Sequence, residues 1–241
     1  MPLKKVDLFL GGSIGLWALG QVSPRQVSQV FTPDEEIVRE AEGMGIEAGG
    51  RDVNAADFGQ REIGFSVHYP KILRPHLIER YQKIYNLHPG YLPWGRGFYP
   101  VFWALWEQTP AGATLHEINA GVDEGPVVAQ TRVPYYPYDT GGSLHERVRA
   151  AEEALFLEYW PRIVGGEDLG ARRQPEGEGS RHTKREFFAL KERAPVESLS
   201  GADLLRLIRC LSFPGFTGLE VSLGEKKFEV RLERLAGPGD A

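Results

Sequence analysis

The stretch that decides the fold is YNLHPGYLPWGRG, residues 85–97. It places Asn86 and His88 two positions apart at the end of a short apolar segment, 84–88, which we predict to be a strand. Positions i and i+2 of a strand share one face, and the Pro/Gly-rich turn that follows sends the chain away. Asn86 and His88 are therefore expected at the carboxyl end of a strand, where open α/β sheets bind their ligands.

A second stretch, GATLHEINAGVDEGPVVAQ at 112–130, adds a carboxylate, Asp123, on a tightly bent connection between two glycines. An amide donor, an imidazole and a carboxylate suit acyl transfer without a covalent enzyme intermediate. Taken singly, each also has a structural interpretation: Asn86 as a strand-end turn residue, His88 as a satisfied interior histidine and Asp123 as a turn former. We further hypothesise that the loop elevates the pKa of Asp123.

The composition sets limits on the class of protein. The 241 residues carry a formal net charge of -5, which offers no electrostatic footprint for nucleic acid or an anionic membrane. A single cysteine, Cys210, excludes an internal disulfide framework and a cysteine metal cluster, and it fits the reducing cytoplasm. The apolar run 6–10 is too short for a signal peptide or a membrane span.

Strand and helix patterns alternate along the first two thirds of the chain. Apolar runs predict strands at 6–10, 26–31, 63–67, 84–88, 114–118 and 127–133. Capping boxes predict helices that begin at Thr32 with Glu35 and at Ser143 with Glu146, and Pro100 opens a buried aromatic helix. These elements indicate an α/β fold, a Rossmann-like, doubly wound, mostly parallel sheet.

The glycines after the first strand give only a weak signal for a nicotinamide cofactor. Gly12 and Gly15 match the end of G-x-G-x-x-G, but Leu10 stands where its first glycine belongs. A tight strand-to-helix turn of any doubly wound sheet explains them as well.

We predict three parts in the chain. Residues 1–166 form the catalytic domain, 167–180 a polar linker, and 181–241 a small α+β appendage with a helix from about 200 and a hairpin at 218–232 that ends it. The appendage has too few apolar residues to be stable alone, so it should dock on the main domain or on a partner subunit.

The motifs Asn-x-His-Pro, Leu-Pro, Arg-Gly, Thr-x-His and Asp-x-Gly-Pro, closed by a glutamine, follow one another between 86 and 130. In this order they resemble the formyltransferases that use 10-formyltetrahydrofolate, and the resemblance covers roughly the first 165 residues. It implies the formyltransferase fold, 10-formyltetrahydrofolate as co-substrate, no metal, and Asn86, His88 and Asp123 as the catalytic residues.

The same resemblance implies two sets of binding residues. The pterin pocket would be lined by Lys71, Ile72, Leu73, Ala120, Gly121 and Val122. The acceptor would be bound by Tyr91, Trp94, Arg96 and Glu117. Three points stay open: Ile72 and Leu73 could merely cap the core, Arg96 could brace its loop instead of pairing with a phosphate, and His116 could replace Glu117, because adjacent strand residues face opposite ways.

The turn at 91–97 and the tail segments 181–188 and 207–214 are similar to sugar N-formyltransferases. This implies an acceptor of the nucleotide-linked amino sugar type, such as a dTDP-4-amino-4,6-dideoxyhexose, and a homodimer. The alternatives are a formyltransferase for another small amine (an amino acid or a purine-pathway intermediate), a formyltetrahydrofolate hydrolase, and a non-catalytic nucleotide-binding module of Rossmann type.

Overall fold

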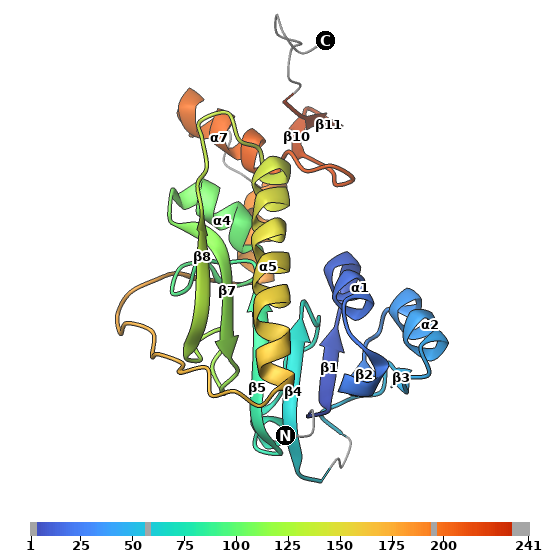
Figure 1. The fold of residues 1–241 in the computed structure, drawn as a ribbon. Helices are drawn as coiled ribbons and strands as arrows, with labels where there is room; N and C mark the ends of the chain where they lie inside the picture. The colour runs from blue at the N-terminus through green and yellow to red at the C-terminus, as the bar shows by residue number, and fades with distance from the viewer. Residues whose placement is uncertain (1–3, 56–58, 194–196, 233–241) are drawn as a thin grey trace, which may run out of the picture.

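The computed structural model describes residues 4–55, 59–193 and 197–232. Its centre is a seven-stranded sheet in the order β3-β2-β1-β4-β5-β7-β8 (Figure 1). The strands are β1 (Val6–Leu10), β2 (Val27–Phe31), β3 (Ala48–Gly49), β4 (Arg61–Val67), β5 (Tyr81–His88), β7 (Ala111–Glu117) and β8 (Val127–Val133). The pairings among β1 to β5 are parallel, and β7 and β8 are antiparallel to their neighbours. The predicted mostly parallel α/β sheet is confirmed.

Helices α1 (Gly12–Gly20), α2 (Glu35–Gly43) and α5 (Gly141–Val164) pack on one face of the sheet, and α3 (Pro75–Ile78) packs on the other (Figure 1). Alternate residues of β1 show this: Leu8 belongs to the core that contains α1 and α5, whereas Phe9 packs with Leu77 of α3. The chain therefore leaves β1 toward one face and β4 toward the other. This topological switch point puts a crevice at the carboxyl ends of the strands.

Two helices begin at residues other than the ones that we predicted. The cap of α2 is Asp34, whose side chain accepts from the N–H of Glu36, while Thr32 instead accepts from the N–H of Asp34. The cap of α5 is Thr140, and Ser143 serves as its capping-box partner. In each case a second polar residue with a short side chain lies within three positions and offers the same acceptor, so the pattern alone misplaced the start.

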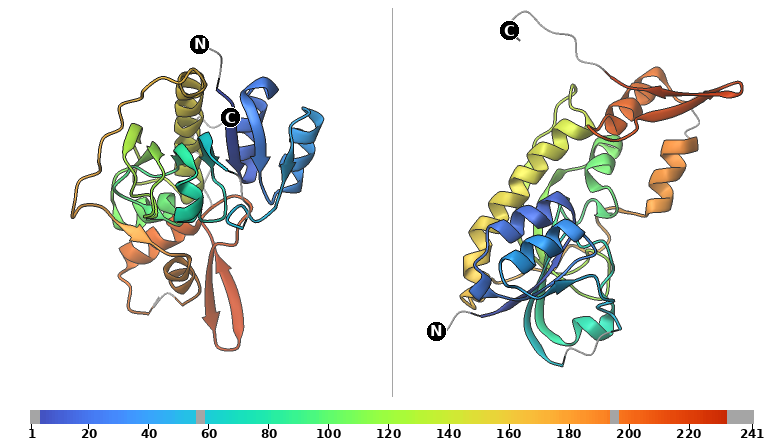
Figure 2. Two further views of the ribbon diagram at one scale, coloured as in Figure 1. Left: turned by 90° about the horizontal axis from the view of Figure 1, so that it is seen from below. Right: turned by 90° about the vertical axis from the view of Figure 1, so that its right-hand side faces the viewer.

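The C-terminal part packs against the part of the chain that forms the sheet. Helix α4 (Pro100–Glu107) lies between the sheet and α7 (Gly201–Leu211). The same end of the molecule holds α6 (Lys184–Arg193) and the hairpin formed by β10 (Leu219–Leu223) and β11 (Lys226–Val230) (Figure 2). Buried residues of α7 and β10 belong to the core that contains α5. The C-terminal part docks on the main domain, which is one of the two arrangements that we expected; the domain limits stay predictions.

The predicted linker, 167–180, passes the β7 and β8 side of the sheet (Figures 1 and 2). Arg172 exchanges two main-chain hydrogen bonds with Val127 of β8. Farther on, β9 (Arg181–His182) pairs with β6 (Arg96–Gly97), which lies in the turn after β5. Among the described helices, none combines the length and apolarity of a membrane span.

Candidate active site

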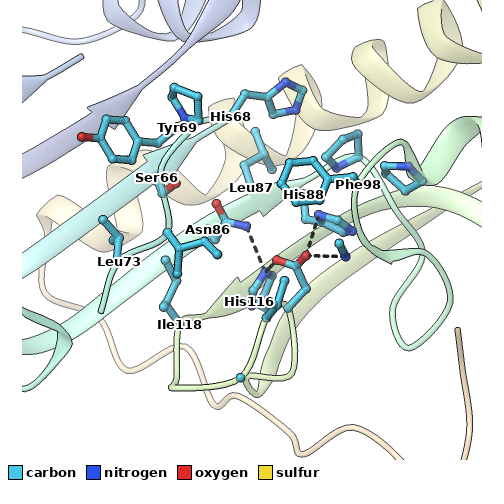
Figure 3. A pocket seen from close by; sticks show the side chains of 18 of the residues that line it. Ser66, His68, Tyr69, Leu73, Asn86, Leu87, His88, Phe98, His116 and Ile118 are labelled. Carbon is cyan, nitrogen blue, oxygen red and sulfur yellow. Dashed lines mark hydrogen bonds and ion pairs between the residues drawn. The ribbon is translucent and has the colours of Figure 1, made fainter. Parts of the chain in front are cut away.

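A cavity of about 330 Å³ opens at the carboxyl ends of β4 and β5 (Figure 3). Loops 68–73 and 118–123 close it on two sides, and 97–100 closes a third. The polar side chains that line it include Ser66, His68, Asn86, His88, His116, Asn119 and Asp123. The three residues predicted to be catalytic thus lie together, although Asp123 follows His88 by more than thirty positions in the chain.

Asn86 reaches the cavity because β5 pairs with β7 in a fixed register. Asn86 stands directly opposite His116, and its Nδ2 lies 3.1 Å from Nε2 of His116. Nδ1 of His116 lies 2.8 Å from the carbonyl oxygen of Glu117, which only accepts, so this nitrogen carries a hydrogen. In the neutral imidazole, Nε2 of His116 is then the acceptor for the Asn86 amide.

His88 is buried at the end of β5, where Nε2 lies 2.9 Å from the carbonyl oxygen of Gly95. We assign the hydrogen to Nε2, since the carbonyl only accepts. Nδ1 lies 3.7 Å from Oδ2 of Asp123. Burial lowers the pKa of His88 below its ordinary value, and Asp123 opposes this only in part. The lowered pKa favours the neutral imidazole.

Asp123 sits in a left-handed backbone conformation, with a φ of 54°. Oδ2 accepts from the main-chain N–H of Gly97 at 2.9 Å, and Oδ1 lies 3.5 Å from Nε2 of His116. Burial alone raises the pKa of Asp123, but the imidazole of His88, then that of His116, and the N–H of Gly97 outweigh it and lower the pKa far below the ordinary range. The hypothesis of an elevated pKa was wrong, because the two neighbouring imidazoles and the Gly97 N–H outweigh the effect of burial on the pKa of Asp123.

All six residues predicted for the pterin pocket line this cavity, from Lys71 to Leu73 on one side and from Ala120 to Val122 on the other. Ile72 is 64% exposed, so it does not cap the core. Leu73 is buried in the cluster around Phe9 and thus contacts the core and the cavity at once. That these residues bind a folate stays a prediction.

The residues predicted to bind the acceptor are placed differently. Within the described residues, the side chains of Tyr91, Trp94, Arg96 and Glu117 line neither this cavity nor the one beside it. Nε and Nη2 of Arg96 donate to Oε1 of Gln174 at 3.1 and 2.8 Å, which favours the bracing alternative. Glu117 accepts from Lys83 at 2.7 Å on the other side of β7. His116, which we had ranked below Glu117, is the one that faces the cavity.

Sequence reasoning missed His68, which follows β4 as His88 ends β5. Its Nε2 lies 2.8 Å from Oε1 of Glu152, a buried carboxylate of α5. Burial acts to lower the pKa of His68, but Glu152 raises it above its ordinary value. The argument that selected His88, its place at the end of a strand, applies equally to His68. No pattern in the sequence indicated that Glu152, 84 residues away, would be the partner of His68.

A second cavity, of about 390 Å³, adjoins the first and shares Pro89, Tyr99 and Pro100 with it. Its walls are mostly apolar, and Lys191 and His145 border it. The aromatic side chains in these walls are Tyr99, Phe102, Phe187, Phe188, Phe213 and Phe216. Flat apolar walls beside a cation are suited to a nucleobase and its phosphates. In the part of the chain that the structure describes, no cluster of three or more metal-ligating side chains occurs.

Comparisons with known proteins agree with this geometry. The model of the formyl transferase family matches residues 54–159, which include β4, β5, β7 and β8. A dTDP-4-amino-4,6-dideoxyglucose formyltransferase of Mycobacterium bovis is 27% identical over 171 residues, 68% of this chain and 72% of its own. The formyltransferase PseJ of Anoxybacillus kamchatkensis, solved with UDP-4,6-dideoxy-4-formamido-L-AltNAc and tetrahydrofolate, is 28% identical, with a TM-score of 0.58 over 83% of this chain and 94% of that one.

The fold itself is shared more widely. A candidate sugar N-formyltransferase from Mycobacterium tuberculosis superposes with a TM-score of 0.81 over 98% of this chain and all of its own, at 23% identity. The shared architecture includes the C-terminal part, since nearly the whole chain is covered. Over residues 54–159, which carry Asn86, His88 and Asp123, the chain is similar to the formyl transferase family.

Proposed function

We propose that this protein transfers the formyl group of 10-formyltetrahydrofolate to the amino group of a nucleotide-linked amino sugar of the dTDP-4-amino-4,6-dideoxyhexose type. The observation that carries the proposal is the convergence of Asn86, His88 and Asp123 on one cavity. The names of the relatives support the acceptor class, since one acts on a dTDP-linked amino sugar and another was solved with a UDP-linked one.

The chemistry divides among these three side chains. The acceptor amine attacks the formyl carbon, and the carbonyl oxygen becomes an oxyanion to which the Asn86 amide donates. The amine proton passes to the Asp123 carboxylate, which is ionised and buried, with the Nδ1 lone pair of His88 facing it. The bond from the formyl carbon to folate N10 then breaks, and N10 receives the proton. The products are the formamide and tetrahydrofolate.

The two adjoining cavities support a two-substrate reaction. The folate would lie between loops 71–73 and 120–122, with its formyl group at Asn86. The nucleoside would lie in the aromatic cavity, where Phe187 stacks on Tyr99 at 4.0 Å between ring centroids. The sugar amine then reaches the catalytic side chains past Pro89, Tyr99 and Pro100, which belong to both cavities.

Incubation with 10-formyltetrahydrofolate separates the alternatives. Tetrahydrofolate formation that depends on a nucleotide-linked amino sugar supports the proposal. Dependence on an amino acid or a purine-pathway amine indicates a different acceptor. Formate release without any amine indicates the hydrolase, and no reaction at all indicates the nucleotide-binding module. A panel of dTDP- and UDP-linked sugars with the amine at different positions then identifies the acceptor.

Alanine substitutions test the assignment of the catalytic side chains. Asn86→Ala, His88→Ala and Asp123→Ala should each leave a folded protein whose turnover falls by at least about 100-fold. Asn86→Ala removes the oxyanion donor, Asp123→Ala removes the proton acceptor, and His88→Ala removes the imidazole that faces this acceptor. Circular dichroism checks the fold, and single-turnover kinetics measures the chemical step. Near-normal turnover in His88→Ala would refute the assignment.

We also propose that the protein is a homodimer and works in the cytoplasm, as its resemblance to sugar N-formyltransferases implies. Sedimentation at micromolar concentration tests the first proposal, and fractionation of cells that express the full chain tests the second.

A further inference from the structure

Gln174 lies in the segment between α5 and β9 and makes four hydrogen bonds that join two catalytic loops. Its Nε2 donates to the carbonyl oxygens of Asp123 and Gly125 at 2.8 and 2.9 Å. Its Oε1 accepts from Nε and Nη2 of Arg96 at 3.1 and 2.8 Å. Both amide hydrogens and both lone pairs are used, so this side chain has one fixed orientation.

These contacts form a closed ring of Asp123, Gln174, Arg96 and Gly97. Gly97, the neighbour of Arg96, donates its main-chain N–H to Oδ2 of Asp123 at 2.9 Å. Gln174 donates to the main-chain carbonyl of the same aspartate, and the Arg96 guanidinium connects Gln174 back to the turn that carries Gly97. The carboxylate and the donor that faces it are therefore fixed relative to each other by Gln174.

Such a ring matters because Asp123 adopts a conformation that an aspartate alone seldom holds. A left-handed φ at a residue other than glycine persists only where the surroundings enforce it. The two amide hydrogens of Gln174 bind the main-chain carbonyls of Asp123 and Gly125 and so stabilise this conformation. The segment that presents Gln174 is itself anchored, by the Arg172 pair with Val127 before it and by the bond from Gly95 N–H to Ser180 Oγ after it.

The geometry points to Gln174 as a positioning residue for formyl transfer: through the carbonyls of Asp123 and Gly125 and the guanidinium of Arg96, it sets where the Asp123 carboxylate stands. The inference rests on the proposed function of Asp123. It also gives residues 167–180 a role in the active site. Within the described residues, Gln174 is not part of the lining of either cavity, so it acts on the reaction through Asp123.

Two substitutions separate this role from simple anchoring of the segment. Gln174→Met keeps the length of the side chain and removes all four bonds. Gln174→Glu keeps an acceptor for Arg96 but has no donor for the two carbonyls. Positioning through the carbonyls predicts that both variants lower kcat by about 10-fold to 100-fold, the effect of a misplacement near 1 Å, with KM for both substrates within about twofold. Glu176→Gln, at an exposed position of the same segment, is the matched control and should retain full kcat.

A second readout needs no substrate. Titration of the Asp123 carboxyl carbon by NMR in the free protein should show a higher pKa in both Gln174 variants than in the wild type, because the carboxylate loses its fixed distance to the Gly97 N–H. Arg96→Met, which loosens only one side of the ring, should fall between wild type and Gln174→Met in both measurements. If a Gln174 variant folds poorly, Arg96→Met still tests the inference through both measurements.

Full kcat in Gln174→Glu would overturn the inference, since the segment would then need only its contact with Arg96. An Asp123 titration that is unchanged in both variants would do so as well, even if the melting temperature fell. If the wild type transfers no formyl group to any amine, the proposed function fails. The Asp123 titration still decides whether Gln174 positions that carboxylate.

Discussion

Two histidines that border one cavity have opposite electrostatic surroundings. His88 is buried beside the carbonyl of Gly95, and the nearest carboxylate oxygen, on Asp123, lies 3.7 Å away. His68 lies 2.8 Å from the carboxylate of Glu152. Burial costs the imidazolium its hydration in both places, and only His68 has a carboxylate close enough to outweigh that cost. The surroundings therefore lower the pKa of His88 and raise that of His68.

This difference predicts two separate titrations. In an NMR titration of the imidazole carbons, His88 should have a midpoint below its ordinary pKa of 6.5 and His68 a midpoint above it. The spectra of His88→Gln and His68→Gln assign the two signals. Glu152→Gln should bring the midpoint of His68 below 6.5, because burial then acts without a neighbouring carboxylate. A His88 midpoint above 6.5 would contradict the neutral imidazole assigned here.

At the scale of elements, the site depends on how closely the loop after β7 folds back on that strand. A Cβ added at Gly125 would stand 1.7 Å from the carbonyl oxygen of Glu117, so only glycine allows this approach. The loop carries Asp123, and Gln174 holds the carbonyl of Gly125 itself. The strand pairing and the loop therefore position the carboxylate together.

Gly125→Ala should displace this loop and abolish most activity. We expect a loss of about 1–3 kcal/mol in the free energy of unfolding, the usual cost of overpacking, and a fall in kcat of about 100-fold from the misplaced carboxylate. Gly43→Ala is the matched control, because a Cβ there meets nothing within 4 Å. Urea denaturation and steady-state kinetics measure both effects. Full activity in a folded Gly125→Ala protein would show that the close approach is dispensable.

At the scale of the whole molecule, the catalytic and C-terminal parts share one core. Leu207 of α7 is fully buried among residues that include α5, whereas Leu205, two positions earlier, is 58% exposed. Helix α7 thus presents one side to the main domain. This sharing explains how a short helix and a hairpin persist without a core of their own.

The shared core predicts cooperative unfolding. Leu207→Ala should lower the free energy of unfolding by about 2–5 kcal/mol and shift the denaturation of the whole chain, as seen by tryptophan fluorescence of the catalytic part. Leu205→Ala on the same helix should change it by less than about 0.5 kcal/mol. A Leu207→Ala protein that loses only its C-terminal helices, with the catalytic part unaffected, would indicate two independent units.

Features that depend on local periodicity and on motif order could be predicted from the sequence. Asn86 and His88 share a face because side chains alternate along any strand, and the turn after them needs no tertiary information. The alternation of strands and helices likewise predicted the sheet, and the order of motifs predicted that Asp123 would join the pair. Helix starts were less certain, because neighbouring residues such as Thr140 and Ser143 compete for the same cap.

Only the tertiary structure decided which groups surround the three side chains. The pairing register of β5 with β7 turns His116 toward the cavity and Glu117 toward Lys83. The pKa of Asp123 falls because distant segments bring two imidazoles and the Gly97 N–H to a partly buried carboxylate, and Gln174 reaches its loop from 51 positions away. Contacts of this kind arise when the whole chain packs, and no local pattern in the sequence encodes them.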